Sequence, residues 1–272
     1  MTGQLAAAEP YTMRWEAQVT AVDGRDVTLD TSYFYTESGG QPSDTGRIES
    51  FDVIGVGREG GDVVHTLSEP PEFDAGTTVL ATVDRTRRRY HMRAHTASHA
   101  LYGAGRHLLE DLGYGGFDIA SPTLDDGDVR ATPENGKVRI DFRTSTDVDD
   151  DILIEMERLV NRAVWDGREV SWTSIPLAEA RERDEIAFNT KTEEGVFDNA
   201  DSVRVVTIEA VNGEDEHWDV AACGGTHVSN TREIGPVHIL DRSNPGEGLT
   251  RVEFAVGPPG IDRAAAVHRT AR

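Results

Sequence analysis

Apolar and polar residues alternate along the first part of the chain. Apolar residues at positions 15, 17, 19 and 21 alternate with polar ones, and positions 27 and 29 repeat the alternation. This two-residue period is typical of half-buried β-strands. Glycine and proline residues interrupt residues 11–83 at short intervals. Short strands with such punctuation predict a small β-barrel in this segment.

The pattern changes at Asp84, after which glycine is sparse and helix-forming residues predict a helix to about residue 112. A second helix is expected over residues 148–165, where an apolar stripe at helical spacing follows aspartates that suit a helix N-terminus. Further elements are expected as a short helix over 177–184 and strands over 202–208, 236–240 and 249–256. The second part of the chain is therefore predicted to be α+β.

Composition adds an unusual charge balance. The 272 residues include 49 acidic and 27 basic ones, with a formal net charge of -22, and only Lys137 and Lys191 are lysines. Such a carboxylate-rich, lysine-poor surface predicts adaptation to high salt, that is, a halophilic protein. A net negative charge argues against nucleic-acid binding, although concentrated salt weakens phosphate contacts in any case.

Neither a membrane span nor a secretion signal is expected. No run of about 18 apolar residues occurs, and the first eleven residues lack a basic flank followed by an apolar stretch. Cys223 is the single cysteine, which excludes an internal disulfide. We therefore expect a cytoplasmic protein.

Four residues form two pairs with metal-ligand spacing. His95 and His99 are four apart on the predicted helix, so their imidazoles share one face. Cys223 and His227 are also four apart, and the glycines between them permit a tight turn. Either pair alone is commonly incidental, and a lone cysteine is commonly an inert core residue. Together, three nitrogens and one sulfur form a tetrahedral set that suits one zinc ion.

These two segments, HTASH at residues 95–99 and CGGTH at residues 223–227, resemble a known family. They are similar to the editing domain of alanyl-tRNA synthetase and to its free-standing relatives, the AlaX proteins. The resemblance covers roughly residues 15–257. The paired motifs also occur in the editing domain of threonyl-tRNA synthetase.

A glycine-rich loop strengthens the resemblance. FYTESGGQPSDTG, at residues 34–46, resembles the FYxExGGQ loop of the alanyl family, although such a segment can also be an ordinary turn. The loop implies the longer AlaX form. The expected organisation is a β-barrel domain over 1–84, a zinc-binding α+β editing domain over 85–258 and a short tail over 259–272.

The resemblance implies hydrolysis of tRNA(Ala) mischarged with serine or possibly glycine. Gln41 and Cys223 are the expected catalytic residues, and Gln41 is expected to position the ester or a water molecule. Zinc would either activate water or orient the amino acid. Ser32 stands where the family usually carries a threonine thought to contact the substrate serine. The expected substrate-binding residues are Thr31, Ser32, Gly39, Gly40, Gln41 and Asp44, with Asp44 orienting Gln41.

The densest basic cluster in the chain precedes His95. Such a run is usually a solvated helix face paired with nearby carboxylates. Because it leads directly into the metal motif, we also expect it to contact tRNA phosphates. The expected tRNA-binding residues are Arg87, Arg88, Arg89 and Arg93.

Three other functions compete with this interpretation. The first is editing of a different tRNA, such as Ser-tRNA(Thr), which the Gly-Gly-Gln loop disfavours. The second is a zinc-stabilised tRNA-binding module without catalysis. The third is a release-factor type of Gly-Gly-Gln loop, in which the two metal-ligand pairs have no place.

Overall fold

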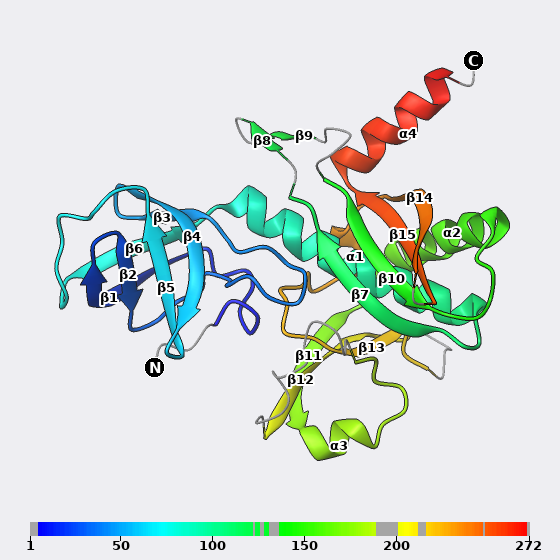
Figure 1. Ribbon diagram of the computed structural model, residues 1–272, viewed down its shortest axis with the longest axis horizontal. Coiled ribbons are helices and arrows are strands. Elements are labelled where there is room, and N and C mark those ends of the chain that lie inside the picture. Colours follow the sequence, from blue (N-terminus) through cyan, green and yellow to red (C-terminus); the bar gives the residue numbers. More distant parts are fainter. Residues whose placement is uncertain are drawn as a thin grey trace.

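The computed structural model of the protein describes residues 5–121, 123–125, 128–130, 136–188, 201–211, 216–246 and 248–270. A β-barrel lies at one end of the molecule, and the long helix α1 (Arg85–Leu108) leads from it into an α+β part (Figure 1). This arrangement confirms the predicted fold class. Among the described helices, none combines the length and the apolar character needed to cross a bilayer.

The barrel closes six short strands in the order β1-β2-β5-β4-β3-β6. Val19, Val27 and Leu67 are among the alternate side chains that fill its interior, as the two-residue period of a strand requires. Closure pairs both edges of the sheet. The strands are β1 (Arg14–Asp23), β2 (Asp26–Leu29), β3 (Gly46–Ile48), β4 (Phe51–Glu59), β5 (Asp62–Leu67) and β6 (Thr78–Val83).

Helix α1 begins directly after the barrel and ends four residues before the predicted limit of 112. Asp84 caps it, since its carboxylate accepts hydrogen bonds from the backbone N–H groups of Thr86 and Arg87 at 2.9 and 3.0 Å. Gly103 permits a close approach, because a Cβ there would lie 2.5 Å from the indole of Trp218. The helix is buried along most of its length.

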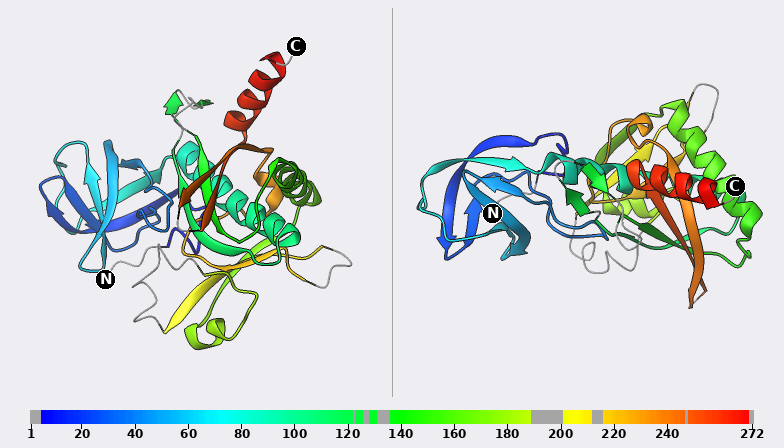
Figure 2. Two further views of the ribbon diagram at one scale, coloured as in Figure 1. Left: turned by 45° about the vertical axis from the view of Figure 1, so that its right-hand side comes forward. Right: turned by 90° about the horizontal axis from the view of Figure 1, so that it is seen from above.

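A four-stranded antiparallel sheet with the order β14-β15-β10-β7 packs on α1 and α2 through one continuous apolar core (Figure 2). Helix α2 (Asp150–Asp166) confirms the helix predicted over 148–165. Asp149 caps its start, and Gly167 ends it in the left-handed conformation at φ 68°. The strands are β7 (Gly113–Ile119), β10 (Val138–Arg143), β14 (Val237–Gly246) and β15 (Leu249–Val256).

A three-stranded sheet with the order β11-β12-β13 lies below α1 in Figure 1. Helix α3 (Leu177–Arg181) is shorter than the helix predicted over 177–184. The predicted strands over 202–208 and 249–256 are confirmed. The remaining elements are β8 (Thr123–Asp125), β9 (Asp128–Arg130), β11 (Val170–Pro176), β12 (Ser202–Ile208), β13 (Asp219–Ala222) and the 3-10 turn η1 (Thr231–Glu233).

Helix α4 (Pro258–Thr270) occupies the segment described above as a short tail. It projects away from the α+β part, and Figures 1 and 2 show its far end standing free of the sheet. Within this helix only Pro259 and Gly260 are buried, residues 263–265 are half-buried, and residues 266–270 are exposed. The polar composition of the remaining turns is why no packed element was predicted there.

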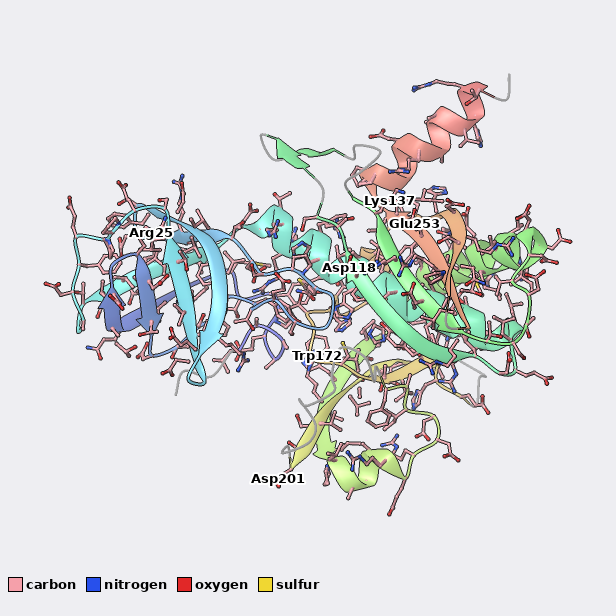
Figure 3. All side chains as sticks on the ribbon, in the orientation of Figure 1. Arg25, Asp118, Lys137, Trp172, Asp201 and Glu253 are labelled. Carbon is pink, nitrogen blue, oxygen red and sulfur yellow. The ribbon has the colours of Figure 1, made fainter. Side chains whose placement is uncertain are left out.

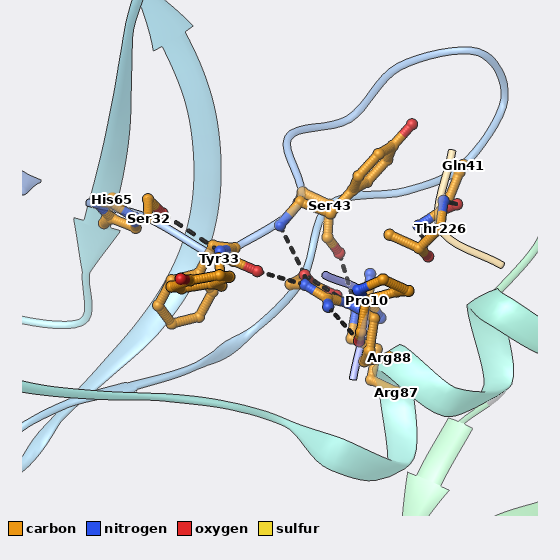
Figure 4. Close-up of polar contacts among 12 residues, drawn as sticks. Pro10, Ser32, Tyr33, Gln41, Ser43, His65, Arg87, Arg88 and Thr226 are labelled. Carbon is orange, nitrogen blue, oxygen red and sulfur yellow. Dashed lines mark hydrogen bonds and ion pairs between the residues drawn. The ribbon is translucent and has the colours of Figure 1, made fainter. Parts of the chain in front are cut away.

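A buried ion pair fastens the barrel to α1. Arg88 and Asp44 are both fully buried, and the guanidinium contacts both carboxylate oxygens (Figure 4). Arg88 also donates to the carbonyls of Pro10 and Tyr33 at 2.9 and 2.5 Å. The backbone N–H of Tyr35 donates to Asp44 at 2.7 Å. Three segments of chain therefore depend on this one pair.

Replacing Arg88 with alanine tests this dependence. Arg88→Ala leaves the Asp44 carboxylate buried without its counter-charge, so we expect the free energy of unfolding to fall by about 3–5 kcal/mol. Arg47→Ala is the control, because it breaks the exposed Arg47–Asp52 pair and is expected to cost at most about 1 kcal/mol. Urea unfolding at constant salt measures both, and equal losses in the two variants would contradict the assigned role.

Candidate metal centre

Four side chains from two distant segments converge between α1 and β13. His95 and His99 come from successive turns of α1, and Cys223 and His227 come from the turn that follows β13. Their potential ligand atoms all lie within 4.8 Å of one another. Each of the four residues is at most 9% exposed, so the centre is shielded from bulk water.

The imidazoles present their Nε2 atoms to the centre. Nε2 of His95 and Nε2 of His227 lie 3.4 and 3.2 Å from the Cys223 sulfur. On the outer side, Nδ1 of His95 faces Gln41 Oε1 at 2.9 Å and Nδ1 of His99 faces Asp219 Oδ2 at 2.8 Å. Nδ1 of His227 faces the hydroxyl of Thr96 at 3.1 Å.

This outer hydrogen bonding is what metal-bound histidine requires. A partner that accepts the Nδ1 proton fixes the tautomer and leaves Nε2 free to coordinate. All three histidines are oriented in this way, and the sulfur completes a set of three nitrogens and one thiolate. The donor set therefore fits a metal ion with tetrahedral preference, as zinc has.

The electrostatics of the cluster favour a bound cation. Burial by itself raises the pKa of the Cys223 thiol, but His95 and His227 outweigh it and hold that pKa well below its usual range. Burial lowers the pKa of His99, yet the hydrogen bonds to Asp219 and Cys223 outweigh burial and raise this pKa to about 10. A thiolate thus coexists with either a proton on His99 or a metal ion that replaces it.

The two glycines of the CGGTH turn have different roles. A Cβ on Gly225 would lie 2.1 Å from Cε1 of His95, whereas a Cβ on Gly224 would meet nothing within 4 Å. The turn is held from β12 by Arg204, whose guanidinium donates to the carbonyls of Cys223 and Gly225 at 2.8 and 3.1 Å. Only Gly225 is therefore required by the packing of the ligands.

The Gly-Gly-Gln loop of the barrel reaches this centre. Gly40 has φ +83°, and a Cβ there would lie 2.0 Å from the carbonyl oxygen of Phe117 in β7. Its own carbonyl accepts from Ile119 at 2.9 Å. Gly39 also has positive φ, at +58°, but open space surrounds it. The Phe117 ring stacks on the His95 ring, with 4.6 Å between the ring centroids. Phe117 therefore contacts both the loop and a potential metal ligand.

Gln41 is a positioning residue in this geometry. It is fully buried, and its Oε1 accepts from Nδ1 of His95 and from the backbone N–H of Thr226, at 2.9 and 3.1 Å. Its Nε2 donates to the Thr226 hydroxyl at 2.9 Å. The amide therefore holds a potential metal ligand in place, and its expected role toward the ester or a water molecule stays a prediction.

One expected role is corrected, and the substrate contacts expected for Ser32 and Thr31 stay predictions. Asp44 does not orient Gln41, because its carboxylate is taken up by Arg88 and Tyr35. Ser32 is fully buried, and its hydroxyl pairs with Nε2 of His65 at 2.8 Å. Figure 4 shows this pair on the side of the loop away from Gln41 and Thr226. Thr31 uses its backbone carbonyl to accept from the indole of Trp15.

The basic cluster divides into two groups. Arg88 is removed from the expected tRNA contacts, because it is fully buried in the pair with Asp44. Arg87 donates through Nε to the carbonyl of Ser43 at 2.9 Å and so secures the end of the loop. Arg89 and Arg93 lie on the outer side of α1 and line a groove with Arg85.

Sequence reasoning did not identify Thr96, Asp219, Arg204 and Thr226 as parts of the site. Thr96 stands inside the first metal motif, and Thr226 stands inside the second. Asp219 precedes Cys223 by four residues, and this spacing is the one sequence signal that it gave. Arg204 gave none, since its contact with the CGGTH turn depends on the pairing of β12 with β13.

Comparison with known proteins gives two family matches. The model described as the second additional domain of threonyl and alanyl tRNA synthetase matches residues 203–253, which contain β12, β13 and the CGGTH turn. The model described as tRNA synthetases class II (A) matches residues 6–87, which contain the barrel. The two matches therefore contain Gln41, Cys223 and His227, whereas His95 and His99 of α1 lie between the two matched ranges.

The similar curated proteins from the following three organisms are all alanine-tRNA ligases. The chain is 34% identical to the alanine-tRNA ligase of Pyrococcus abyssi over 264 residues, which are 96% of this chain and 26% of that protein. It is 34% identical over 265 residues to that of Thermococcus kodakarensis, with the same two shares. It is 32% identical over 268 residues to that of Ignicoccus hospitalis, covering 97% and 27%. The chain thus spans about a quarter of the length of these relatives.

The adjacent glycines of the CGGTH turn give a matched test of the centre. Gly225→Ala forces the turn away from the His95 ring, so we expect zinc affinity to fall by at least about tenfold. Gly224→Ala, which meets open space, is expected to bind zinc within about twofold of the unmodified protein. Competition with a chromophoric chelator measures both affinities, and equal zinc binding by the two variants would contradict this geometry.

Proposed function

Because this chain belongs to the alanyl-tRNA synthetase editing-domain family, we propose that it hydrolyses the ester of tRNA(Ala) mischarged with serine or glycine. We further propose that the metal at His95, His99, Cys223 and His227 is zinc. The observation that carries the proposal is the convergence of these four ligands with the barrel loop, through the contacts of Gln41 with His95 and Thr226. The barrel therefore takes part in building the centre.

The proposed reaction is addition of water to the ester carbonyl carbon. The bond from that carbon to the ribose oxygen breaks, and the products are the free amino acid and a tRNA with a free terminal hydroxyl. Zinc supplies Lewis-acid chemistry when it is bound. Gln41, Thr96 and Asp219 orient the three imidazoles, and Phe117 covers one face of His95. The protein thus contributes a preformed and largely dry site.

Selectivity has a simple physical basis. An activation pocket that accepts alanine rejects glycine weakly, and it rejects one added hydroxyl only modestly. A second site that hydrogen-bonds the serine hydroxyl spares alanine, because alanine leaves that polar partner unpaired at a cost of about 1–3 kcal/mol. We expect this difference in free energy to make the serine ester react faster than the alanine ester.

Ester loss from defined aminoacyl-tRNAs tests the activity. In molar KCl with zinc present, we expect Ser-tRNA(Ala) to be hydrolysed about 10- to 100-fold faster than Ala-tRNA(Ala). The reason is the free-energy cost of the polar group that alanine leaves unpaired. Cys223→Ala is expected to abolish the activity, and Gly224→Ala is expected to retain it. Gly-tRNA(Ala) and Ser-tRNA(Thr) are assayed in parallel.

Each alternative has its own result in this assay. Faster hydrolysis of Ser-tRNA(Thr) than of Ser-tRNA(Ala) would assign the protein to threonine editing. No hydrolysis of any ester by folded, zinc-loaded protein that still binds tRNA would leave a zinc-stabilised binding module. Either outcome would overturn the proposed activity.

We also propose that the outer face of α1 contacts the tRNA backbone. Arg85, Arg89 and Arg93 recur every four residues, and with Tyr90 and Pro258 they line a groove of about 250 Å³. None of the three arginine side chains forms an ion pair or hydrogen bond with the residues that the structure describes. Free guanidinium groups in a row suit the phosphates of an RNA strand.

Removing two of these charges tests the contact. For the Arg89→Ala/Arg93→Ala double variant we expect weaker binding of uncharged tRNA(Ala), and a slope of log affinity against log salt that is shallower by about 2. Arg25→Ala is the control, since Arg25 lies on the barrel, away from α4 (Figure 3), and does not line the groove. A double variant with the slope of the control would contradict the contact. Fluorescence anisotropy between 0.2 and 1 M KCl measures the binding.

A further inference from the structure

Asp219 occupies an unusual position beside the metal centre. It opens β13, is 1% exposed, and faces Nδ1 of His99 through Oδ2 at 2.8 Å. Its other oxygen, Oδ1, is also buried and has no hydrogen-bond partner among the described residues. A carboxylate removed from water normally needs more than one neutral N–H to keep its charge. Asp219 therefore implies a positive charge nearby.

A divalent metal ion held by the four ligands would supply that positive charge. A divalent metal ion contributes +2 and the Cys223 thiolate contributes −1. The guanidinium of Arg204, which donates to the carbonyl of Cys223 at 2.8 Å, adds +1. Without a further anion, this buried region would carry a net charge of +2. Asp219 is the one carboxylate, within the described parts of the chain, that hydrogen-bonds to any of the four ligands.

The partners of the other two imidazoles are uncharged. His95 faces the amide of Gln41, and His227 faces the hydroxyl of Thr96. These neutral groups fix ring orientation but cannot offset the charge of the metal. The three imidazoles are thus oriented in the same way, but only His99 is oriented by a charged group.

We propose that Asp219 is the buried counter-charge of the metal centre, which raises metal affinity by its charge as well as by orienting His99. This inference rests on the metal site of the proposed function and goes beyond it, because it assigns a role to a residue outside the ligand set. Loss of such an outer partner typically lowers metal affinity by 10- to 100-fold. The same charge makes His99 the most strongly donating of the three imidazoles.

Zinc binding by matched variants tests the proposal without any assay of hydrolysis. Asp219→Asn keeps the shape and a hydrogen-bond acceptor but removes the charge, and Asp219→Ala removes both. Asp201→Asn is the control, because it deletes one exposed carboxylate directly before β12 (Figure 3). Chelator competition gives the zinc affinity and the rate of zinc release for the full chain. Circular dichroism and the absorption of the cobalt-substituted protein confirm the fold and tetrahedral coordination.

We expect both Asp219 variants to bind zinc at least about tenfold more weakly and to release it faster than the Asp201→Asn control. Wild-type affinity in Asp219→Asn, with loss only in Asp219→Ala, would overturn the counter-charge role. Wild-type affinity in both variants would overturn any role of Asp219 toward the metal. Because the readout is metal binding, these results stand apart from a failure of the proposed hydrolysis.

Discussion

Burial of helix α1 on several sides at once is the constraint on which the rest of the structure depends. Its first turns carry Arg88 into the barrel junction, and its next turns carry His95 and His99 into the metal centre. Small residues further along let Trp218 and the core sheet approach its backbone. Since one rigid helix carries all three contacts, the barrel and the ligands are held in fixed relation to each other.

Backbone approach, more than side-chain chemistry, decides how the two glycine-rich turns meet. Gly40 lies against the carbonyl of Phe117 and Gly225 lies against the ring of His95, and neither place has room for a Cβ. Their neighbours Gly39 and Gly224 have open space instead. The two turns thus bring Gln41 and Thr226 within hydrogen-bonding distance, although 185 residues separate them. The barrel contributes to the centre by supplying this one amide.

The features predicted correctly from the sequence are those marked by a local repeat or by the spacing of a motif. The barrel strands, α1, α2 and the four ligands have strong local signals, because each depends on a short repeat or a pair of residues four apart. The surroundings of Arg88 and Asp44 were misjudged, since a charged side chain near a motif carries no sign of whether it faces solvent or a buried partner. Asp219 and Arg204 act through strand pairing, which a single sequence does not specify. Helix α4 lacks the apolar stripe that marks a packed helix.

The ligands of the centre are not held equally. Each imidazole has an outer partner at 2.8–3.1 Å. Within the described residues, the Cys223 sulfur accepts one backbone N–H, from Gly225 at 3.4 Å. The backbone of Cys223 is held by Arg204, whose guanidinium donates to the Cys223 carbonyl and whose carbonyl accepts from the Cys223 N–H. Hydrogen bonds to sulfur are weak, so the three nitrogens form a rigid frame and the sulfur side keeps more freedom. Among the four residues that would hold the metal, Cys223 is therefore the one whose side chain has the fewest restraining contacts.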